Sequence, residues 1–236
     1  RLVIDGPPDA ALYLRARQWM GQRDTSRPLF MVLETLSSHL PWIHPEGGPC
    51  TEEGVMRYTD EKAAEFLEVL ARDGFLSRGG IIVVVSDHRA LTPLSPGEEA
   101  IGATARSRIP MFVMGGGLPR GPVEGDWQQI DIPNSLRWLT ANGVCLEAPG
   151  AGNFLISPAR TPGVIVHHQN LDRGLLDIFV PSAKGLAHSI YQMNGDKSAF
   201  LEGPAHVGLG RQIDAIRLHR DGRCLAENIA LLAAGR

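Results

Sequence analysis

This chain of 236 residues has few cysteines, no excess of basic charge and no long apolar run. Its three cysteines, Cys50, Cys145 and Cys224, lie far apart without a C-x-x-C pair, which excludes a zinc knuckle and a redox motif but leaves one disulfide open. The net charge is −3, so we expect no basic surface for nucleic acid. No apolar run reaches the length of about 18 residues that spans a bilayer, so we expect no transmembrane segment in this chain.

The common catalytic motifs are missing as well. The sequence holds no G-x-S-x-G elbow, no P-loop, no G-x-G-x-x-G after a predicted strand and no H-E-x-x-H. These absences exclude the familiar serine hydrolase, nucleotide-binding and zincin patterns. What is present is 43% hydrophobic and 21% charged residues, a composition typical of a globular protein.

The most informative segment is Ile81–Val85, a run of β-branched residues followed directly by Ser86, Asp87 and His88. The run predicts a strand buried on both faces. Ligands of open α/β sheets gather at the carboxyl ends of strands. A carboxylate oxygen and an imidazole nitrogen side by side at such an end offer two ligands to one divalent cation. The alternative is that Asp87 caps the next segment and His88 is an ordinary histidine.

The apolar pattern predicts alternating helices and strands in the first part of the chain. We expect strands at 28–33, 81–85 and 109–114, and helices at 10–20, 58–72 and 131–142. A strand, a helix and a further strand indicate a right-handed parallel crossover. We therefore predict an α/β fold over residues 1–148, with a mostly parallel central sheet flanked by helices.

The apolar pattern of the sequence changes after about residue 148. Short apolar runs at 164–167, 175–180 and 198–201 are separated by turn signals such as Asn194-Gly195. This spacing of short apolar runs and turns predicts a small carboxyl-terminal antiparallel β subdomain with a terminal helix, over residues 149–236.

A second candidate is His39, in the loop Ser38-His39-Leu40-Pro41-Trp42 that follows the first predicted strand. If that strand and 81–85 were neighbours in a parallel sheet, His39 would open onto the same edge as Asp87 and His88. Such a histidine could bind a phosphate or sulfate, or protonate a leaving oxygen. The alternative is a loop histidine held by Pro41 and Trp42.

Other polar groups are interpreted as structural. Glu98 and Glu99 lie in a loop, where carboxylates are more often solvated. Arg108 stands just before a predicted strand and is expected to form an ion pair, although it could clamp an anion. His167 and His168 alternate faces on a predicted strand, so at most one of them could reach a site.

The order of these segments resembles the alkaline phosphatase and sulfatase superfamily. It is most similar to the lipoteichoic-acid-synthase-like group, which includes phosphoglycerol transferases that act outside the inner membrane. The likeness rests on four segments: Pro28–Leu33 with Ser38–Trp42, Tyr58-Thr59-Asp60 with the helix running to Asp73-Gly74, the strand ending in Ser86-Asp87-His88, and Arg108–Val113. The stretches Phe154–Arg160 and Tyr191–Gly195 resemble the final small sheet of that group.

The resemblance implies roles for three residues. Asp87 and His88 would be two ligands of the active-site divalent metal, often manganese in this group, with magnesium, calcium or zinc as alternatives. His39 would contact the transferred phosphoryl or sulfuryl group. The family's nucleophile and a further acidic ligand precede these segments in the family and have no counterpart before residue 28 here. Arg89 stands where many sulfatases have glycine, a departure from the strict sulfatase pattern.

The same resemblance implies a parent protein. The chain begins at Arg1 without methionine, and we expect it to be the carboxyl-terminal half of the catalytic domain, with the amino-terminal half as its partner. The parent would be a sulfatase-like hydrolase or transferase in the periplasmic part of an inner-membrane protein. Its substrate would be a phosphate or sulfate ester, lipid-linked or glycan-linked. The chain alone is predicted to be catalytically silent.

Two other hypotheses about the function remain open. The chain could be a non-catalytic module that uses the edge around His39 and Trp42 to bind an anionic glycan or lipid head group. It could also belong to a cytoplasmic metal-dependent phosphomutase of the same superfamily. A metal response that depends on Asp87 would separate the enzyme readings from the binding module.

Overall fold

The structure is a computed structural model that describes residues 6–90, 92–115, 118, 120–123, 125, 127–129, 131–139, 165–168, 174–194 and 197–204. The chain divides into two compact units, residues 1–83 with 113–117, and residues 84–112 with 118–236. None of the helices in the described ranges combines the length and the apolar character needed to cross a bilayer.

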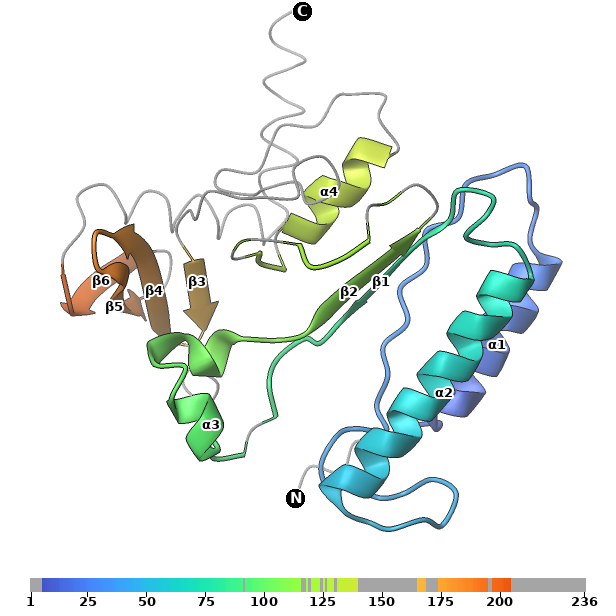
Figure 1. Cartoon of the computed structure of the whole chain (residues 1–236), viewed down its shortest axis with the longest axis horizontal. Helices are drawn as coiled ribbons and strands as arrows, with labels where there is room; N and C mark the ends of the chain where they lie inside the picture. Colours follow the sequence, from blue (N-terminus) through green and yellow to red (C-terminus); the bar gives the residue numbers. More distant parts are fainter. Residues whose placement is uncertain are drawn as a thin grey trace, which may run out of the picture. The chain divides into compact units, whose positions relative to one another are not determined.

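The first unit is built on two helices, α1 (Asp9–Gln22) and α2 (Glu52–Arg72), which lie side by side in Figure 1. Their packing includes the stacked rings of Tyr13 and Phe66, whose centroids are 4.7 Å apart. Arg17 of α1 lies 3.6 Å from the Asp73 carboxylate just beyond α2, an exposed ion pair that contributes little. Aromatic contact and apolar burial therefore hold the pair together.

Local signals explain the ends of α2. The Thr51 side chain accepts a hydrogen bond from the Gly54 amide at 3.1 Å, and Glu52 and Glu53 complement the positive end of the helix dipole. The helix stops at Asp73, and Gly74 follows with a φ of 75°. The predicted end is thus confirmed, whereas the predicted start at Tyr58 is wrong because the capping threonine lies further upstream.

The segment predicted as the first strand, 28–33, is extended but is not a strand. Its side chains alternate between half-buried and exposed, and Phe30 and Val32 are 77% and 76% exposed. Within the described residues its backbone makes no hydrogen bond to a neighbouring strand. A strand needs such a partner, so the apolar pattern alone overstated this element.

The predicted strand 81–85 is present as β1 (Ile81–Val85), and it pairs with β2 (Met111–Gly115) in a two-stranded sheet. The Ser86 amide after β1 donates to the Pro110 carbonyl before β2 at 3.4 Å. The end of one strand therefore lies beside the start of the other, which makes the pair antiparallel (Figure 1). Val84 and Val85 are each 38% exposed, so the expectation of burial on both faces is wrong.

These observations correct the predicted fold class. Among the described residues there are two small antiparallel sheets and no mostly parallel central sheet. The physical reason is that β-branched runs reveal where a strand forms, while its neighbours are decided by hydrogen bonds between distant segments. Here β1 takes its partner after a loop, and 28–33 takes none in the described part of the chain.

The loop between β1 and β2 contains the short helix α3 (Pro96–Glu99) and the 3₁₀ helix η1 (Ala103–Ser107). Further along, α4 (Asp131–Leu139) begins where the sequence predicts a helix. Its first residue, Asp131, is fully buried and accepts a hydrogen bond from the Gln128 amide at 2.7 Å.

The second sheet has four antiparallel strands in sequence order: β3 (Ile165–His168), β4 (Leu175–Ser182), β5 (Gly185–Asn194) and β6 (Lys197–Glu202). Leu176, Ile178 and Tyr191 form a buried apolar cluster with Val166 and Val180 packed against it. The antiparallel arrangement agrees with the turn signals of the sequence. The predicted boundary near residue 148 and the terminal helix lie outside the described residues.

Candidate functional site

Asp87 and His88 follow β1 directly, and their side chains converge. The Asp87 Oδ2 atom lies 3.3 Å from His88 Nε2, and Asp87 Oδ1 accepts the His88 backbone amide at 2.8 Å. Both side chains reach solvent, being 85% and 47% exposed. An oxygen and a nitrogen are therefore presented together to an incoming ligand.

The tautomer of His88 follows from its other ring nitrogen. Nδ1 lies 2.6 Å from the Arg89 carbonyl oxygen, which can only accept a hydrogen bond. The neutral ring therefore carries its proton on Nδ1 and leaves a lone pair on Nε2. The Nε2 atom lies 3.3 Å from Asp87 Oδ2, so in the neutral form of the ring two acceptor atoms stand close together. A cation or an added proton is needed to make this contact favourable.

The separation of the two acceptors suits a metal. Ligand atoms with bonds of about 2.1 Å lie about 3.0 Å apart at an octahedral angle and about 3.4 Å apart at a tetrahedral angle. The observed 3.3 Å falls between these values. A carbonyl that holds the distal ring nitrogen is also the usual support of a metal-binding histidine. The pair thus fits a divalent cation, although among the described residues no group of three or more His, Cys, Asp or Glu side chains is arranged to hold one.

The loop that carries this pair is braced from inside. Arg89 makes a two-point ion pair with Glu98, with Nε–Oε1 at 2.9 Å and Nη2–Oε2 at 3.1 Å. The Arg89 guanidinium also donates to the backbone carbonyls of Ala90 and Thr92. The arginine side chain at this position therefore stabilises the loop through several hydrogen bonds, which a glycine could not make.

Glu98 is the second half of this brace. It completes a capping box with Ser95 at the start of α3, accepting from the Ser95 amide and hydroxyl at 2.7 and 2.8 Å. Arg89, followed by Ser95, lowers the pKa of Glu98 to about 2. The expectation of a merely solvated Glu98 is wrong, and the run Ser95-Pro96-Gly97-Glu98 was the signal that could have revealed it.

His39 lies in the first unit, in an exposed turn. Its Nδ1 atom is 2.6 Å from the Leu40 carbonyl oxygen, so its neutral ring also keeps a lone pair on Nε2. In both candidate histidines, His39 and His88, the carbonyl oxygen of the next residue therefore determines the tautomer of the neutral ring. Asp87 and His88 belong to the second unit, and the parallel sheet that would give His39 the same edge is not found among the described residues.

The loop of His39 is anchored to the start of α1 by Asp9. This side chain is 1% exposed, and its Oδ1 atom accepts the amides of Leu36 and Ser37, both at 3.0 Å. The Asp9 amide donates in turn to Ser37 Oγ at 3.1 Å. A single buried carboxylate thus fixes the turn two residues before His39.

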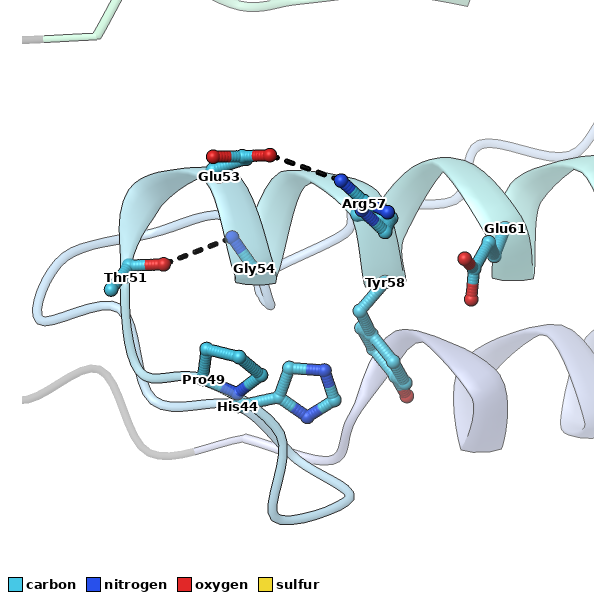
Figure 2. A pocket seen from close by; sticks show the side chains of 8 residues that line it. All are labelled: His44, Pro49, Thr51, Glu53, Gly54, Arg57, Tyr58 and Glu61. Carbon is cyan, nitrogen blue, oxygen red and sulfur yellow. Dashed lines mark hydrogen bonds and ion pairs between the residues drawn. The ribbon is translucent and has the colours of Figure 1, made fainter.

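A pocket of about 380 Å³ lies at the start of α2 (Figure 2). His44 and Tyr58 form one wall, with ring centroids 5.2 Å apart in an edge-on arrangement. Arg57 on the opposite side is paired with Glu53 at 3.0 Å. None of the residues that line this pocket is a site residue predicted from the sequence, so the pocket was not predicted.

A further cluster lies on the four-stranded sheet. The Asp177 carboxylate of β4 accepts from two imidazoles, His188 Nε2 at 2.8 Å and His167 Nδ1 at 3.3 Å. Phe179 stacks on the His188 ring with centroids 4.8 Å apart. His167 faces Asp177 directly across β3 and β4. This pairing could not be read from the sequence because it depends on strand register.

The remaining predicted positions are less informative. The Arg108 Nε atom donates to the Thr104 hydroxyl at 3.2 Å, and within the part of the chain that the structure describes this arginine forms no ion pair, contrary to the expectation. Cys50 is an exposed free thiol, and Cys145 and Cys224 lie outside the described residues. Comparison with protein-family models, with curated proteins and with solved structures found no match to this chain.

Proposed function

We propose that this chain supplies two metal ligands, Asp87 and His88, to a metal-dependent sulfatase-like hydrolase or phosphoglycerol transferase, as the carboxyl-terminal part of its catalytic domain. The observation that supports this most is the approach of two acceptors, Asp87 Oδ2 and His88 Nε2, to 3.3 Å at the end of β1. A divalent cation satisfies both atoms at once. The cation proposed is Mn²⁺, and Mg²⁺, Ca²⁺ or Zn²⁺ would use the same pair.

The chemistry follows from the ligand pair. A divalent metal bound there would stabilise negative charge on the oxygens of a phosphate or sulfate ester and activate a hydroxyl nucleophile. The chain's own contribution is to hold a carboxylate and an imidazole in a fixed orientation, with the loop braced by Arg89 and Glu98. Two protein ligands bind a metal weakly, since affinity depends on ligand count. The isolated chain is therefore proposed to bind metal without catalysing turnover.

His39 is proposed to contact the ester group that is transferred. Its ring presents an Nε2 lone pair in the neutral form and an N–H donor when protonated. Either state serves an oxygen of a phosphate or sulfate, as acceptor or as acid. The substrate is proposed to be a lipid-linked or glycan-linked ester, and the parent to act in the periplasm, with the amino-terminal half of the domain as partner.

Calorimetric titration of the full chain with manganese chloride tests this proposal. We expect a weak binding signal that disappears in Asp87→Asn and in His88→Gln. Asp24→Asn is the matched control, because Asp24 is an exposed carboxylate that likewise accepts a backbone amide nearby, from Ser26. Equal heats in the wild type and Asp87→Asn would refute the metal pair and favour the non-catalytic binding module.

A further inference from the structure

Gln129 makes an unusual contact with the backbone of the candidate site. Its side-chain Nε2 atom donates to two consecutive carbonyl oxygens, Ser86 O at 2.9 Å and Asp87 O at 2.7 Å. More than 40 positions of the sequence separate the partners, so this is a tertiary contact. A side-chain amide carries two N–H groups, so Gln129 can serve both carbonyls at once.

The two carbonyls bracket Asp87. The Ser86 carbonyl belongs to the peptide before the Asp87 Cα atom, and the Asp87 carbonyl belongs to the peptide after it. Holding both peptide planes restricts φ and ψ of Asp87, because these are the only soft backbone angles between them. The direction of the Asp87 side chain and the start of His88 are restricted as a consequence.

Gln129 is itself anchored. It lies in the turn that opens α4, where the Ile132 amide donates to the Gln129 carbonyl at 3.1 Å. In the same turn the Asp131 amide donates to the Gln128 carbonyl at 2.9 Å, and the Gln128 amide donates back to Asp131 Oδ2 at 2.7 Å. The side-chain amide that contacts the Asp87 backbone therefore belongs to a turn whose own backbone is held by hydrogen bonds.

We infer that Gln129 is a positioning residue of the metal pair: it holds the backbone around Asp87 so that the carboxylate and the His88 imidazole converge on one cation. This inference rests on the proposed function, because it concerns the same two ligands. Supporting groups around a metal site change affinity by about 10–100-fold when removed. Gln129 is exposed, which places the expected effect near the lower end of that range.

The test is the affinity of the full chain for Mn²⁺, measured from the electron paramagnetic resonance signal of free manganese in a titration with manganese chloride. Gln129→Met removes the donors without adding charge, and Gln129→Glu removes them while adding a negative charge. Both variants should bind Mn²⁺ about tenfold more weakly than the wild type. The charge of Gln129→Glu would by itself strengthen cation binding, so a loss in that variant reports the missing donors.

Gln128→Glu is the charge-matched control, because it adds the same charge one residue earlier and keeps the oxygen that accepts the Val166 amide. It should bind Mn²⁺ within about twofold of the wild type. Helix content by circular dichroism should be the same in all variants, since Gln129 lies on the surface. The inference is overturned if both Gln129 variants bind like the wild type while Asp87→Asn loses binding. If Asp87→Asn binds like the wild type, the proposed function itself fails.

Discussion

The guanidinium of Arg89 grips Glu98 through two nitrogen–oxygen contacts of 2.9 and 3.1 Å across the loop that follows β1. Arg89 is the residue directly after His88, so this ion pair restrains the backbone that delivers the candidate ligand. The planar fork of arginine matches both carboxylate oxygens, which a lysine ammonium cannot do. The pair therefore connects the geometry of the candidate site to the start of α3.

Replacing Arg89 with lysine should weaken this brace. Lysine keeps the charge but loses the two-point contact, so the pKa of Glu98 is expected to rise from about 2 toward its usual 4.5. Carbon-13 NMR of the Glu98 carboxyl during an acid titration measures the change. Arg108→Lys is the control, because Arg108 contacts the Thr104 hydroxyl and not Glu98. An unchanged pKa in Arg89→Lys would show that the Ser95 contacts alone depress it.

The brace also has a defined pH window. The pKa of its carboxylate is about 2 in the folded chain, against the usual 4.5 of a glutamate, so its stabilising contribution is complete above about pH 4.5 and is lost as the pH falls toward 2. We expect the amide of Ser95, which donates to Glu98, to stay protected from hydrogen exchange at pH 4 and to lose protection near pH 2. Loss of protection already at pH 4 would contradict the assignment.

Asp9 is expected to be a main determinant of stability in the first unit. Asp9→Ala leaves the amides of Leu36 and Ser37 without their acceptor, which should lower the free energy of unfolding by about 2 kcal/mol. Urea unfolding followed by circular dichroism measures this value. Asp9→Asn keeps an accepting oxygen and should cost less. Asp24→Ala is the control, since its bond to the Ser26 amide is exposed and its loss should cost less than about 0.5 kcal/mol.

The cap of α2 gives an independent test of the fold. Thr51→Ala removes the oxygen that accepts the Gly54 amide, and it should lower the free energy of unfolding by about 1 kcal/mol. Thr51→Ser keeps that oxygen and should stay close to the wild type. If serine and alanine were equally destabilising at this position, α2 would not begin where the structure places it.

Part of the fold could be predicted from sequence because some signals are local. The β-branched run at 81–85 forms a strand, the stretch ending at Gly74 forms a helix, and turn-separated runs after residue 164 form an antiparallel sheet. Each of these depends on contacts within a few residues or on hydrophobic spacing. The mostly parallel sheet failed because strand partners depend on hydrogen bonds between distant segments.

The candidate site divides in the same way. Asp87 and His88 are adjacent in sequence, so their convergence could be anticipated from their position after β1. The clamp by Gln129 and the pairing of Asp177 with His188 could not, because both need tertiary contacts or strand register. The Arg89–Glu98 pair could be predicted only in part. The capping box of Ser95 and Glu98 can be recognised in the sequence, whereas the ion pair of Glu98 with Arg89 cannot.

The most direct test of the metal pair is nitrogen-15 NMR of the His88 ring during titration of the full chain with Zn²⁺, a diamagnetic cation that suits both ligands. We expect the Nε2 resonance to shift as metal is added while Nδ1 keeps its proton on the Arg89 carbonyl, and we expect no shift in Asp87→Asn. A His88 Nε2 resonance that is unmoved at saturating Zn²⁺, or one that shifts equally without the Asp87 carboxylate, would contradict the account.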